Sequence, residues 1–511
     1  MSLVAHRVIK NTIWLYAKMG ITMFISFYTT RLLLSALGVS DFGIYNIVGG
    51  VISLLGFING SMASASQRFM SFAEGSGDKE KQKYIFNISL VLHFGTAMFA
   101  IAAFTIVGYL FFNGILNIPD ERKGAALIVY GSMVVSTAFT VMSVPYEAVM
   151  NAHENMRYYA FVGIFEALLK LVVAFIVVYT LIDKLVVYGI LMTLIPFITL
   201  TIMRVYCHRH YEECVVAPRR YFKSELMKEM TEFAGWSFFS SCSSVITMQG
   251  IAILLNMFGG VIVNAAHGIA NQLTGQLMVF SNNMLKALNP VIVKHEGAGK
   301  TYKMLEAAVT GNKLSFFMFA ILAIPFMVET PFILKLWLVQ VPQWSVIFVR
   351  MVLLRMMLSQ LSVTLGTCVQ ATGKIRNMTI FSTLIWMSPI ILGYYLYHIS
   401  FPIYTIYILL ILMVVLLTCN VLYFCKKYCG LHVRRYLFHA YLPSCGVAAI
   451  TIVLLYCIHC AMPESFLRML VVLFTGIMFY SALTYIIVFD DKERVVIHGA
   501  IYKLKQKTGR C

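Results

Sequence analysis

Six polar side chains recur through Val261 to Val291, a long stretch that is otherwise apolar enough for a lipid bilayer. Their spacings of three, four, seven or eleven residues place them in one sector of a helix, about 100° wide, opposite a face of Leu, Phe and Met. Polar groups in membrane helices normally point into a bundle or a water-filled cavity, because facing lipid costs a charge several kcal/mol. We therefore predict a membrane helix with one wet face, formed by Asn264, His267, Asn271, Asn282, Lys286 and Asn289.

Charged side chains in other apolar stretches extend this prediction. Lys18 and Arg355 lie well inside their predicted helices, and with Lys286 they make the expected cavity net basic. Glu147 is the main acidic group of this cavity. Because intramembrane carboxylates often relay protons, Glu147 and Asp41 are candidate ion-coupling residues. Asp41 has an alternative role as a cap that accepts hydrogen bonds from free amides at its helix start.

Simpler roles compete with a cavity for several of these residues. For any one Asn, hydrogen bonding between packed helices is the favoured explanation; six polar residues in register with a Lys favour a lined cavity. Glu166 and Lys170, four residues apart, can neutralise one another on one helix face. Arg350 and Arg468 lie near helix ends and can extend to the interface. If the cavity exists, its cations suit an anionic polar substrate, because phosphates are natural partners of Arg and Lys.

The composition indicates a membrane protein. The 511 residues are 60% hydrophobic and 12% charged, with a mean hydropathy of +0.81, unlike a soluble globular chain. Apolar runs of about 20 residues, long enough to cross a hydrocarbon core of about 30 Å, recur along the sequence. Backbone groups in lipid must bond internally, which favours helices. We predict an all-α integral membrane protein with about fourteen transmembrane helices, near 11–34, 41–63, 84–112, 124–150, 157–182, 185–206, 232–257, 262–291, 312–330, 344–370, 378–398, 402–424, 438–461 and 467–489.

The formal charge of +18 is explained by membrane topology. With the N-terminus in the cytoplasm, most Lys and Arg fall in cytoplasmic loops and tails, as the positive-inside rule requires. We therefore expect both termini in the cytoplasm and no nucleic-acid partner. Eleven Cys are scattered without framework spacing, and neither Cys207–Cys214 nor Cys457–Cys460 is one of a paired set of ligands. No metal and no cofactor is predicted.

The chain aligns with itself without gaps at shifts of 222 and 219 residues, which matches Gly38 with Gly260, Gly77 with Gly299, and Ala152 with Ala371. Six spans are duplicated, an even number, so both copies enter the membrane from the same side, as in a parallel repeat. The expected parts are an N-terminal six-helix lobe (1–206), a C-terminal six-helix lobe (207–424), and two extra helices with a basic cytoplasmic tail (425–511). Two such lobes around a midline cleft are the architecture of an alternating-access transporter.

Four segments, Tyr28–Arg31, Leu37–Tyr45, Asn151–Tyr159 and Gln370–Arg376, resemble bacterial polysaccharide flippases of the Wzx type. Their superfamily, the MOP exporters, also holds MATE-like multidrug extruders and the lipid II flippase. The resemblance covers nearly the whole chain and implies two six-helix lobes plus two further helices. It also implies translocation of a polyprenyl-pyrophosphate-linked oligosaccharide, such as an O-antigen or capsule repeat unit, across the bacterial inner membrane.

The resemblance implies roles for the polar residues as well. The cations would engage the pyrophosphate or acidic sugars, and the other polar groups would hold the head group. The predicted substrate-binding set is Lys18, Asn264, His267, Asn271, Asn282, Lys286 and Arg355. The implied partners are a lipid-linked oligosaccharide of the undecaprenyl-pyrophosphate type, membrane lipids and other polysaccharide-assembly proteins.

Two other functions remain open from the sequence. A MATE-like multidrug or cation antiporter would share the fold, but lipophilic cations favour carboxylates and aromatic faces over a basic cavity. A membrane-embedded polysaccharide polymerase or ligase usually needs a sizeable outside loop. No HExxH, GxSxG or Walker A motif occurs in the chain, and we therefore predict that it is not an enzyme.

Overall fold

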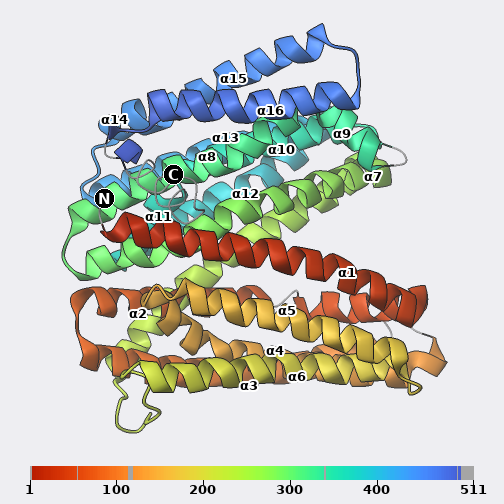
Figure 1. The fold of residues 1–511 in the computed structure, drawn as a ribbon, viewed down its shortest axis with the longest axis vertical. Helices are drawn as coiled ribbons and strands as arrows, with labels where there is room; N and C mark the ends of the chain where they lie inside the picture. The colour runs from red at the N-terminus through yellow and green to blue at the C-terminus, as the bar shows by residue number, and fades with distance from the viewer. Residues whose placement is uncertain (1–2, 54–55, 113–118, 339–340, 492, 496–511) are drawn as a thin grey trace, which may run out of the picture. The chain divides into compact units, whose positions relative to one another are not determined.

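The computed structural model describes residues 3–53, 56–112, 119–338, 341–491 and 493–495 (Figure 1). The elements in these ranges are helices, as expected for an all-α membrane protein: α1 (Leu3–Ser53), α2 (Gly56–Ser76), α3 (Lys79–Leu110), α4 (Asp120–Ala152), α5 (Met156–Tyr179), α6 (Lys184–His210), α7 (Ser224–Gly297), α8 (Thr301–Val328), α9 (Thr330–Trp337), α10 (Ser345–Gln360), α11 (Val363–Ala371), α12 (Arg376–His398), α13 (Thr405–Cys429), α14 (Val433–Tyr436), the π-helix η2 (Leu437–Tyr441), α15 (Leu442–Ala461), α16 (Phe466–Leu483) and the π-helix η3 (Thr484–Val488).

Several helices begin at a polar residue whose side chain caps the first turn. The side chain of Asp78 accepts a hydrogen bond from the amide of Lys81 at the start of α3, with an N to O distance of 2.9 Å. The side chain of Asn155 accepts a hydrogen bond from the amide of Tyr158 at the start of α5, and the side chain of Ser465 accepts one from the amide of Arg468 at the start of α16. Such caps satisfy amides that the first helical turn leaves without partners.

Within the described ranges, twelve helical segments are long and apolar enough to cross a membrane. α1 and α7 each consist of two segments joined at a bend, at Gly38 and Gly260 respectively. The more polar segments that follow these glycines are not among the twelve. Including them confirms the predicted arrangement of about fourteen spans, which the sequence already showed as apolar runs.

The backbone at four glycines confirms the internal repeat. Gly38 and Gly260, matched by the shift of 222, both have φ of +74°, with ψ of 171° and −172°. This region of backbone space is essentially open to glycine alone. The matched pair Gly77 and Gly299 also has positive φ, +74° and +68°. Equivalent positions in the two copies thus make the same turns.

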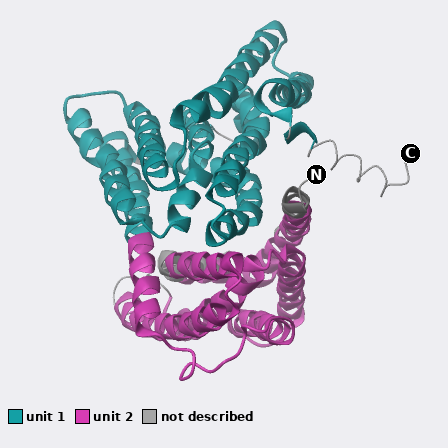
Figure 2. Cartoon of the chain, turned by 90° about the vertical axis from the view of Figure 1, so that its left-hand side faces the viewer, with its two compact units in different colours: residues 1–9, 239–511 teal, residues 10–238 magenta. Residues whose placement is uncertain are grey.

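The chain forms two compact units, shown in Figure 2: unit 2 contains residues 10–238, and unit 1 contains residues 1–9 and 239–511. The predicted boundaries after residues 206 and 424 stay predictions. Of the predicted basic tail, residues 496–511 lie outside the described residues.

Close contacts at glycine hold unit 2 together around α4. A Cβ atom on Gly189 of α6 would lie 2.9 Å from the Val129 side chain of α4, and one on Gly108 of α3 would lie 2.5 Å from the Tyr130 ring. Small residues of this kind let membrane helices approach closely. The Tyr130 hydroxyl donates to the carbonyl of Phe104 at 2.6 Å, so its polar end is satisfied inside the bundle.

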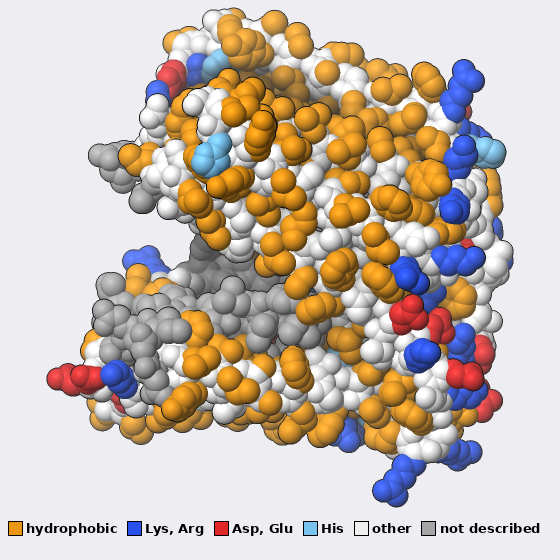
Figure 3. All heavy atoms as spheres, turned by 180° about the vertical axis from the view of Figure 1, so that it is seen from behind, with side chains coloured by type: hydrophobic (Ala, Val, Ile, Leu, Met, Phe, Trp, Pro, Cys, Tyr) orange, Lys and Arg blue, Asp and Glu red, His pale blue; other side chains and the backbone are white. Residues whose placement is uncertain are grey.

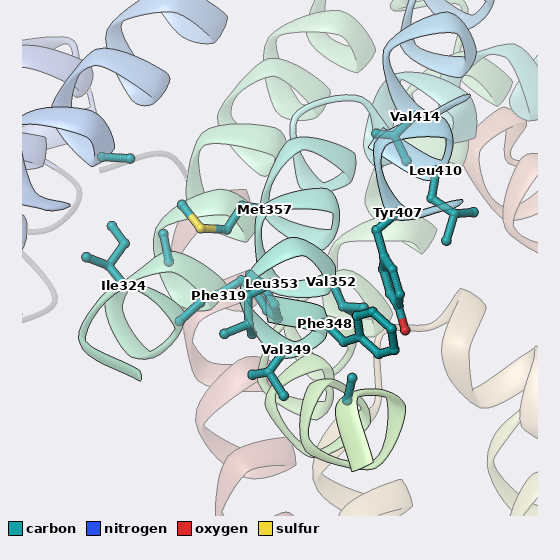
Figure 4. Packing of buried hydrophobic residues seen from close by; sticks show 14 of the residues in the cluster. Phe319, Ile324, Phe348, Val349, Val352, Leu353, Met357, Tyr407, Leu410 and Val414 are labelled. Atoms are coloured by element: carbon teal, nitrogen blue, oxygen red, sulfur yellow. The ribbon is translucent and has the colours of Figure 1, made fainter. Parts of the chain in front are cut away.

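The core of unit 1 is formed mainly by α8, α10 and α13. Figure 4 shows Phe348 and Val352 of α10 beside Tyr407 of α13, with Phe319 of α8 and Leu353 close by. The ring centroids of Phe348 and Tyr407 are 4.3 Å apart. This apolar packing fixes where the Tyr407 hydroxyl lies.

Two ion groups, each centred on a buried charge of α8 or its cap, attach the C-terminal segments to α8. Glu329, at the end of α8, accepts hydrogen bonds from Arg468 of α16 at 3.0 Å and from His459 of α15 at 2.8 Å. Lys313 donates to Asp490 at 3.2 Å and to Glu493 at 3.0 Å. Buried charges need such partners, because an uncompensated one is strongly destabilising.

Arg468 corrects one interpretation from the sequence. We expected it to extend to the interface, but it is only 6% exposed, because Glu329, far away in the sequence, offers it a buried carboxylate. Arg350, the other cation near a helix end, donates to the carbonyls of Met327 and Val328 at the end of α8. Cations bind favourably at such carbonyl ends.

Figure 3 shows how side chains are distributed over one face of the molecule. Hydrophobic side chains cover most of this face, and Lys, Arg, Asp and Glu gather toward its edges. Apolar helix surfaces with charged ends match the hydrocarbon and head-group layers of a bilayer. The chain is a multi-pass membrane protein.

Candidate functional site

The predicted wet face of α7 reaches the surface of unit 1. Asn271 and Asn282 are exposed, and Asn264 is half-buried. Gln272 and Gln276, which the sequence prediction did not include, are exposed on the same helix segment. Exposed amide groups can donate and accept hydrogen bonds at once, as sugar hydroxyls require.

His267 lies directly beneath this face. It is buried, its Nδ1 atom is 2.7 Å from the Tyr407 hydroxyl, and its Nε2 atom is 2.9 Å from Nδ2 of Asn271. If the Asn271 amide donates to Nε2, the proton of a neutral imidazole is on Nδ1 and is donated to Tyr407. His267 thus connects the exposed Asn271 to the packed core.

Arg355 lies in the same part of unit 1. It is 4% exposed, and its Nε atom is buried without a hydrogen-bond partner among the described residues. No carboxylate of a described residue forms an ion pair with Arg355. Its charge acts on both His267 and Tyr407, so the three side chains are neighbours. A buried guanidinium without a counter-ion provides a place for an anionic ligand.

The other predicted residues of α7 lie elsewhere on the helix. At a rise of about 1.5 Å per residue, Lys286 lies about 28 Å along α7 from His267. Lys286 is half-buried, and Asn289 accepts a hydrogen bond from Thr367 of α11 at 3.3 Å. Asn289 therefore fits the alternative role as a contact between packed helices. The predicted set is divided along the helix rather than gathered at one point.

Lys18 belongs to a different group, in unit 2. Its ammonium lies 4.3 Å from the centroid of the Tyr159 ring on α5. Gly163, one turn further along α5, leaves the necessary space, because a Cβ atom there would lie 2.1 Å from Cε of Lys18. Glu147 accepts a hydrogen bond from Ser143 at 3.2 Å, and its charge also acts on Tyr159. The group therefore brings a predicted cation and a predicted coupling carboxylate to one tyrosine.

Tyr159 is the residue of this group that sequence reasoning missed. Its segment, Asn151–Tyr159, carried part of the family resemblance, but periodicity alone gives no signal for an aromatic side chain that holds a cation. Glu166 and Lys170 form the predicted pair on α5, with 2.7 Å between Oε1 and Nζ. They are therefore explained as a neutralised pair.

Asp41 is engaged in an ion network. Arg122 at the start of α4 donates from Nε to Asp41 at 2.9 Å, from Nη2 to Asp41, and from Nη1 to Asp183 at 2.6 Å. Burial is the largest single influence and raises the pKa of Asp183, but the hydrogen bond and charge of Arg122, together with the backbone amides of Val186 and Leu185, outweigh it, so the pKa lies below its usual value. Asp41 and Asp183 together balance Arg122, a structural arrangement.

Another ion group joins the loops of unit 2. His153, just after α4, has Nε2 2.5 Å from Glu213 and Nδ1 3.4 Å from Glu74, and its ring stacks on Tyr211. Burial is the largest single influence and raises the pKa of Glu213, but the hydrogen bond with His153, a backbone hydrogen bond and the charges of His153 and Lys79 together outweigh it, so the pKa lies below its usual value. This group fixes the segment that follows α6 against the end of α4.

The Cys and His residues near the end of α6 are used in packing. Cys207 and Cys214 are buried, His208 packs edge-on against Phe86, and His210 stacks on Tyr206. Among the described residues, no group of three or more His, Cys, Asp or Glu is placed to hold a metal ion.

A family model described as "Polysaccharide biosynthesis protein" matches residues 8–296, more than half of the chain. No curated protein sequence matches the chain.

Solved structures of similar fold are membrane transporters. A MATE protein in its straight conformation is 17% identical, with a TM-score of 0.71, over 84% of this chain and 96% of that one. An outward-facing multidrug resistance MATE family transporter of the MOP superfamily is 15% identical, with a TM-score of 0.70 and the same coverage. A MOP superfamily transporter from Pyrococcus furiosus is 15% identical, with a TM-score of 0.69, again over 84% and 96%. At these identities the likeness shows the fold, which confirms the predicted MATE-like architecture.

Proposed function

We propose, from the premise that this chain belongs to the polysaccharide biosynthesis protein family, that it flips lipid-linked oligosaccharides across a membrane. The family and the fold are those of a membrane transporter. The proposed cargo is a polyprenyl-pyrophosphate-linked repeat unit, moved from the cytoplasmic to the periplasmic face of a bacterial inner membrane. In this orientation both termini lie in the cytoplasm, where other polysaccharide-assembly proteins supply the cargo.

The observation that carries this proposal is the buried Arg355, which has no carboxylate partner in the described part of the chain. A pyrophosphate supplies oxygen atoms that match the planar guanidinium fork. Asn271 is connected to Arg355 through His267, and Gln272 and Gln276 are exposed on the same segment of α7. These amides suit the hydroxyl groups of a neutral or acidic sugar. The arrangement therefore offers both parts of a sugar-phosphate head group a chemical partner.

Transport requires no covalent step. The head group binds to Arg355 and the α7 amides while the lipid tail stays in the bilayer. A change between two conformations, as in alternating access, then exposes the bound head group on the other side. In this mechanism His267 and Tyr407 are positioning residues: they hold Asn271 in place and lie beside Arg355, and neither loses or gains a proton.

The group around Tyr159 supports a site of ion coupling in unit 2. Glu147 is a carboxyl group at membrane depth, the type of group that often relays protons. Any movement of α1 against α5 changes the distance between the Lys18 ammonium and Tyr159, on which Glu147 also acts. Asp41 is a weaker candidate for coupling, because Arg122 already balances its charge. We therefore assign coupling to Glu147 in this proposal.

The charges near Arg355 favour this cargo over a cationic drug. Between Thr330 and Pro463, the range that holds α10 to α13, the sequence has no Asp or Glu. A site for lipophilic cations requires carboxylates or aromatic faces. The similar transporter from Pyrococcus furiosus is described by a binding pocket of reverse polarity that suggests a different function. The sign of the charges in the binding site is therefore a useful criterion for the cargo of a transporter with this fold.

A binding measurement tests the role of Arg355. A water-soluble, short-chain polyprenyl-pyrophosphate oligosaccharide is titrated into the full-length protein in detergent. Charge-assisted hydrogen bonds contribute about 1.5–3 kcal/mol, so we expect Arg355→Gln to bind about 10- to 100-fold more weakly. The control is Arg350→Gln, whose guanidinium binds backbone carbonyls. Equal affinities of the wild type and Arg355→Gln would remove Arg355 from the binding site.

A further inference from the structure

The end of α13 in unit 1 carries an exposed group of cations. Five side chains from three segments belong to it: Lys374 lies between α11 and α12, Lys426 and Lys427 lie in the last turn of α13, and Arg434 and Arg435 lie in α14. We call these five residues the basic patch. It has no part in the proposed binding of the head group by Arg355 and α7.

Two contacts show that these segments converge. The ammonium of Lys374 lies 5.9 Å from the centroid of the Tyr428 ring, and that of Lys427 lies 5.8 Å from it. Gly430, with φ of +74°, ends α13 and turns the chain back, so that α14 follows at once. Residues more than fifty positions apart thus share one tyrosine.

The cations of the patch are not neutralised by direct ion pairs. None of the five forms an ion pair with a described residue, and no acidic residue occurs in the sequence from Thr330 to Pro463. Glu296 at the end of α7 acts on Cys429 of α13 without pairing with any of the five. Some cations at the helix ends of unit 2 differ, because they lie beside carboxylates: Lys79 is 3.3 Å from Glu74, and Arg68 is 3.9 Å from Glu229. The positive-inside rule does not require this difference between paired and unpaired cations.

Large exposed apolar side chains flank the patch along the chain. Tyr423 is 59% exposed, Phe438 is 60% exposed and Leu442 is 51% exposed. They lie on α13, on η2 and at the start of α15, where two spans end. Aromatic side chains beside Lys and Arg at the ends of spans are typical of the interface between hydrocarbon and lipid head groups.

We propose that the basic patch binds the phosphate groups of anionic phospholipids. The Lys and Arg side chains donate charge-assisted hydrogen bonds to phosphate oxygens, and the exposed aromatic and apolar side chains contact the upper part of the acyl chains. Because none of the five cations forms an ion pair with a described residue, their donors are available to the lipid phosphate. This is a lipid site outside the proposed transport site.

Lipid retention tests this proposal. The full-length protein in detergent is titrated with phosphatidylglycerol or phosphatidylcholine, and bound lipids are counted by native mass spectrometry. The variant replaces Lys374, Lys427, Arg434 and Arg435 with Gln, and the control replaces Arg219, Arg220, Lys223 and Lys228, four exposed cations of unit 2, in the same way. We expect the variant to lose about tenfold of its preference for phosphatidylglycerol, since each charge near an anionic surface adds to binding, while the control keeps it.

Several results would overturn the proposal. An unchanged preference in the variant, or an equal loss in the control, shows that the patch is not the site. A second readout needs no variant: raising the salt from about 50 to about 300 mM screens exposed charges and should lower the retention of phosphatidylglycerol by wild type several-fold. Retention that is independent of salt contradicts the proposal. So does binding of inorganic pyrophosphate without a preference for phosphatidylglycerol, because the patch then serves a soluble phosphate.

Discussion

Arg355 differs from the other deeply buried cations in what surrounds it. Lys313 and Arg468 are buried to a similar degree, and each is paired with a carboxylate. Arg355 has no such partner among the described residues. A protein gains nothing in stability from an uncompensated buried charge, which is why we assign Arg355 to a ligand.

Glu213 provides a prediction about pH at the level of one residue. Its pKa in the folded protein lies below the usual value, so the stabilisation that it contributes is complete above the unfolded pKa of about 4.3 and is lost as the pH falls through the folded pKa. We expect the thermal stability of wild type in detergent to fall as the pH is lowered from about 5 toward 3. Glu213→Gln should show a smaller fall over this window. Equal pH profiles of the two proteins would contradict the assignment.

Part of the candidate site could be predicted from the sequence. The spacing of His267 and Asn271 placed both on one face of α7, because helix geometry is local. Their partner Tyr407 is 140 positions away from His267, and no periodicity connects the two. Glu329 was missed for the same reason. Lys286 shares the helix face but not the site, since the period of a helix fixes direction around its axis and not distance along it.

At the level of helices, the bends of α1 and α7 depend on single glycines. Gly38 and Gly260 adopt a backbone conformation that other residues avoid. The repeat of this bend at matched positions indicates that both copies need it, since a straight continuation would carry the following polar segment in another direction.

Gly38→Ala should therefore be destabilising. The strained backbone costs about 1–3 kcal/mol, which thermal unfolding of the purified protein measures. Gly20→Ala is the matched control in α1, because a Cβ atom there meets nothing within 4 Å. Alanine also favours a helix interior over glycine by about 0.5–1 kcal/mol. A variant at Gly38 that is as stable as the control would contradict the strain argument.

The attachment of α16 gives a second prediction at this scale. Glu329→Gln leaves Arg468 buried without a counter-charge, at a cost of about 3–5 kcal/mol. We expect a large drop in the unfolding temperature and faster proteolysis near the C-terminus. The control is Glu464→Gln, which breaks the exposed pair with Lys335 and should change little. Similar effects of both substitutions would show that the buried pair does not hold the helix.

At the level of the whole molecule, the fold class was predictable because the bilayer restricts the chain to helices of a certain length. The apolar runs marked the spans, and the glycine-containing loops marked the repeat. The sequence did not predict that α8 is tied to the C-terminal segments at two points, near its middle through Lys313 and at its end through Glu329. Such ties form between distant segments, and only the folded chain brings them together.

The central claim is that this transporter moves an anionic, lipid-linked sugar by means of a cationic site. The most direct test is transport in proteoliposomes, with a fluorescent polyprenyl-pyrophosphate oligosaccharide whose head group is detected on the far side of the membrane. We expect transport by the wild type and little by Arg355→Gln at matched protein amounts. Normal transport by Arg355→Gln, or transport of a cationic drug in place of the oligosaccharide by the wild type, would contradict the claim.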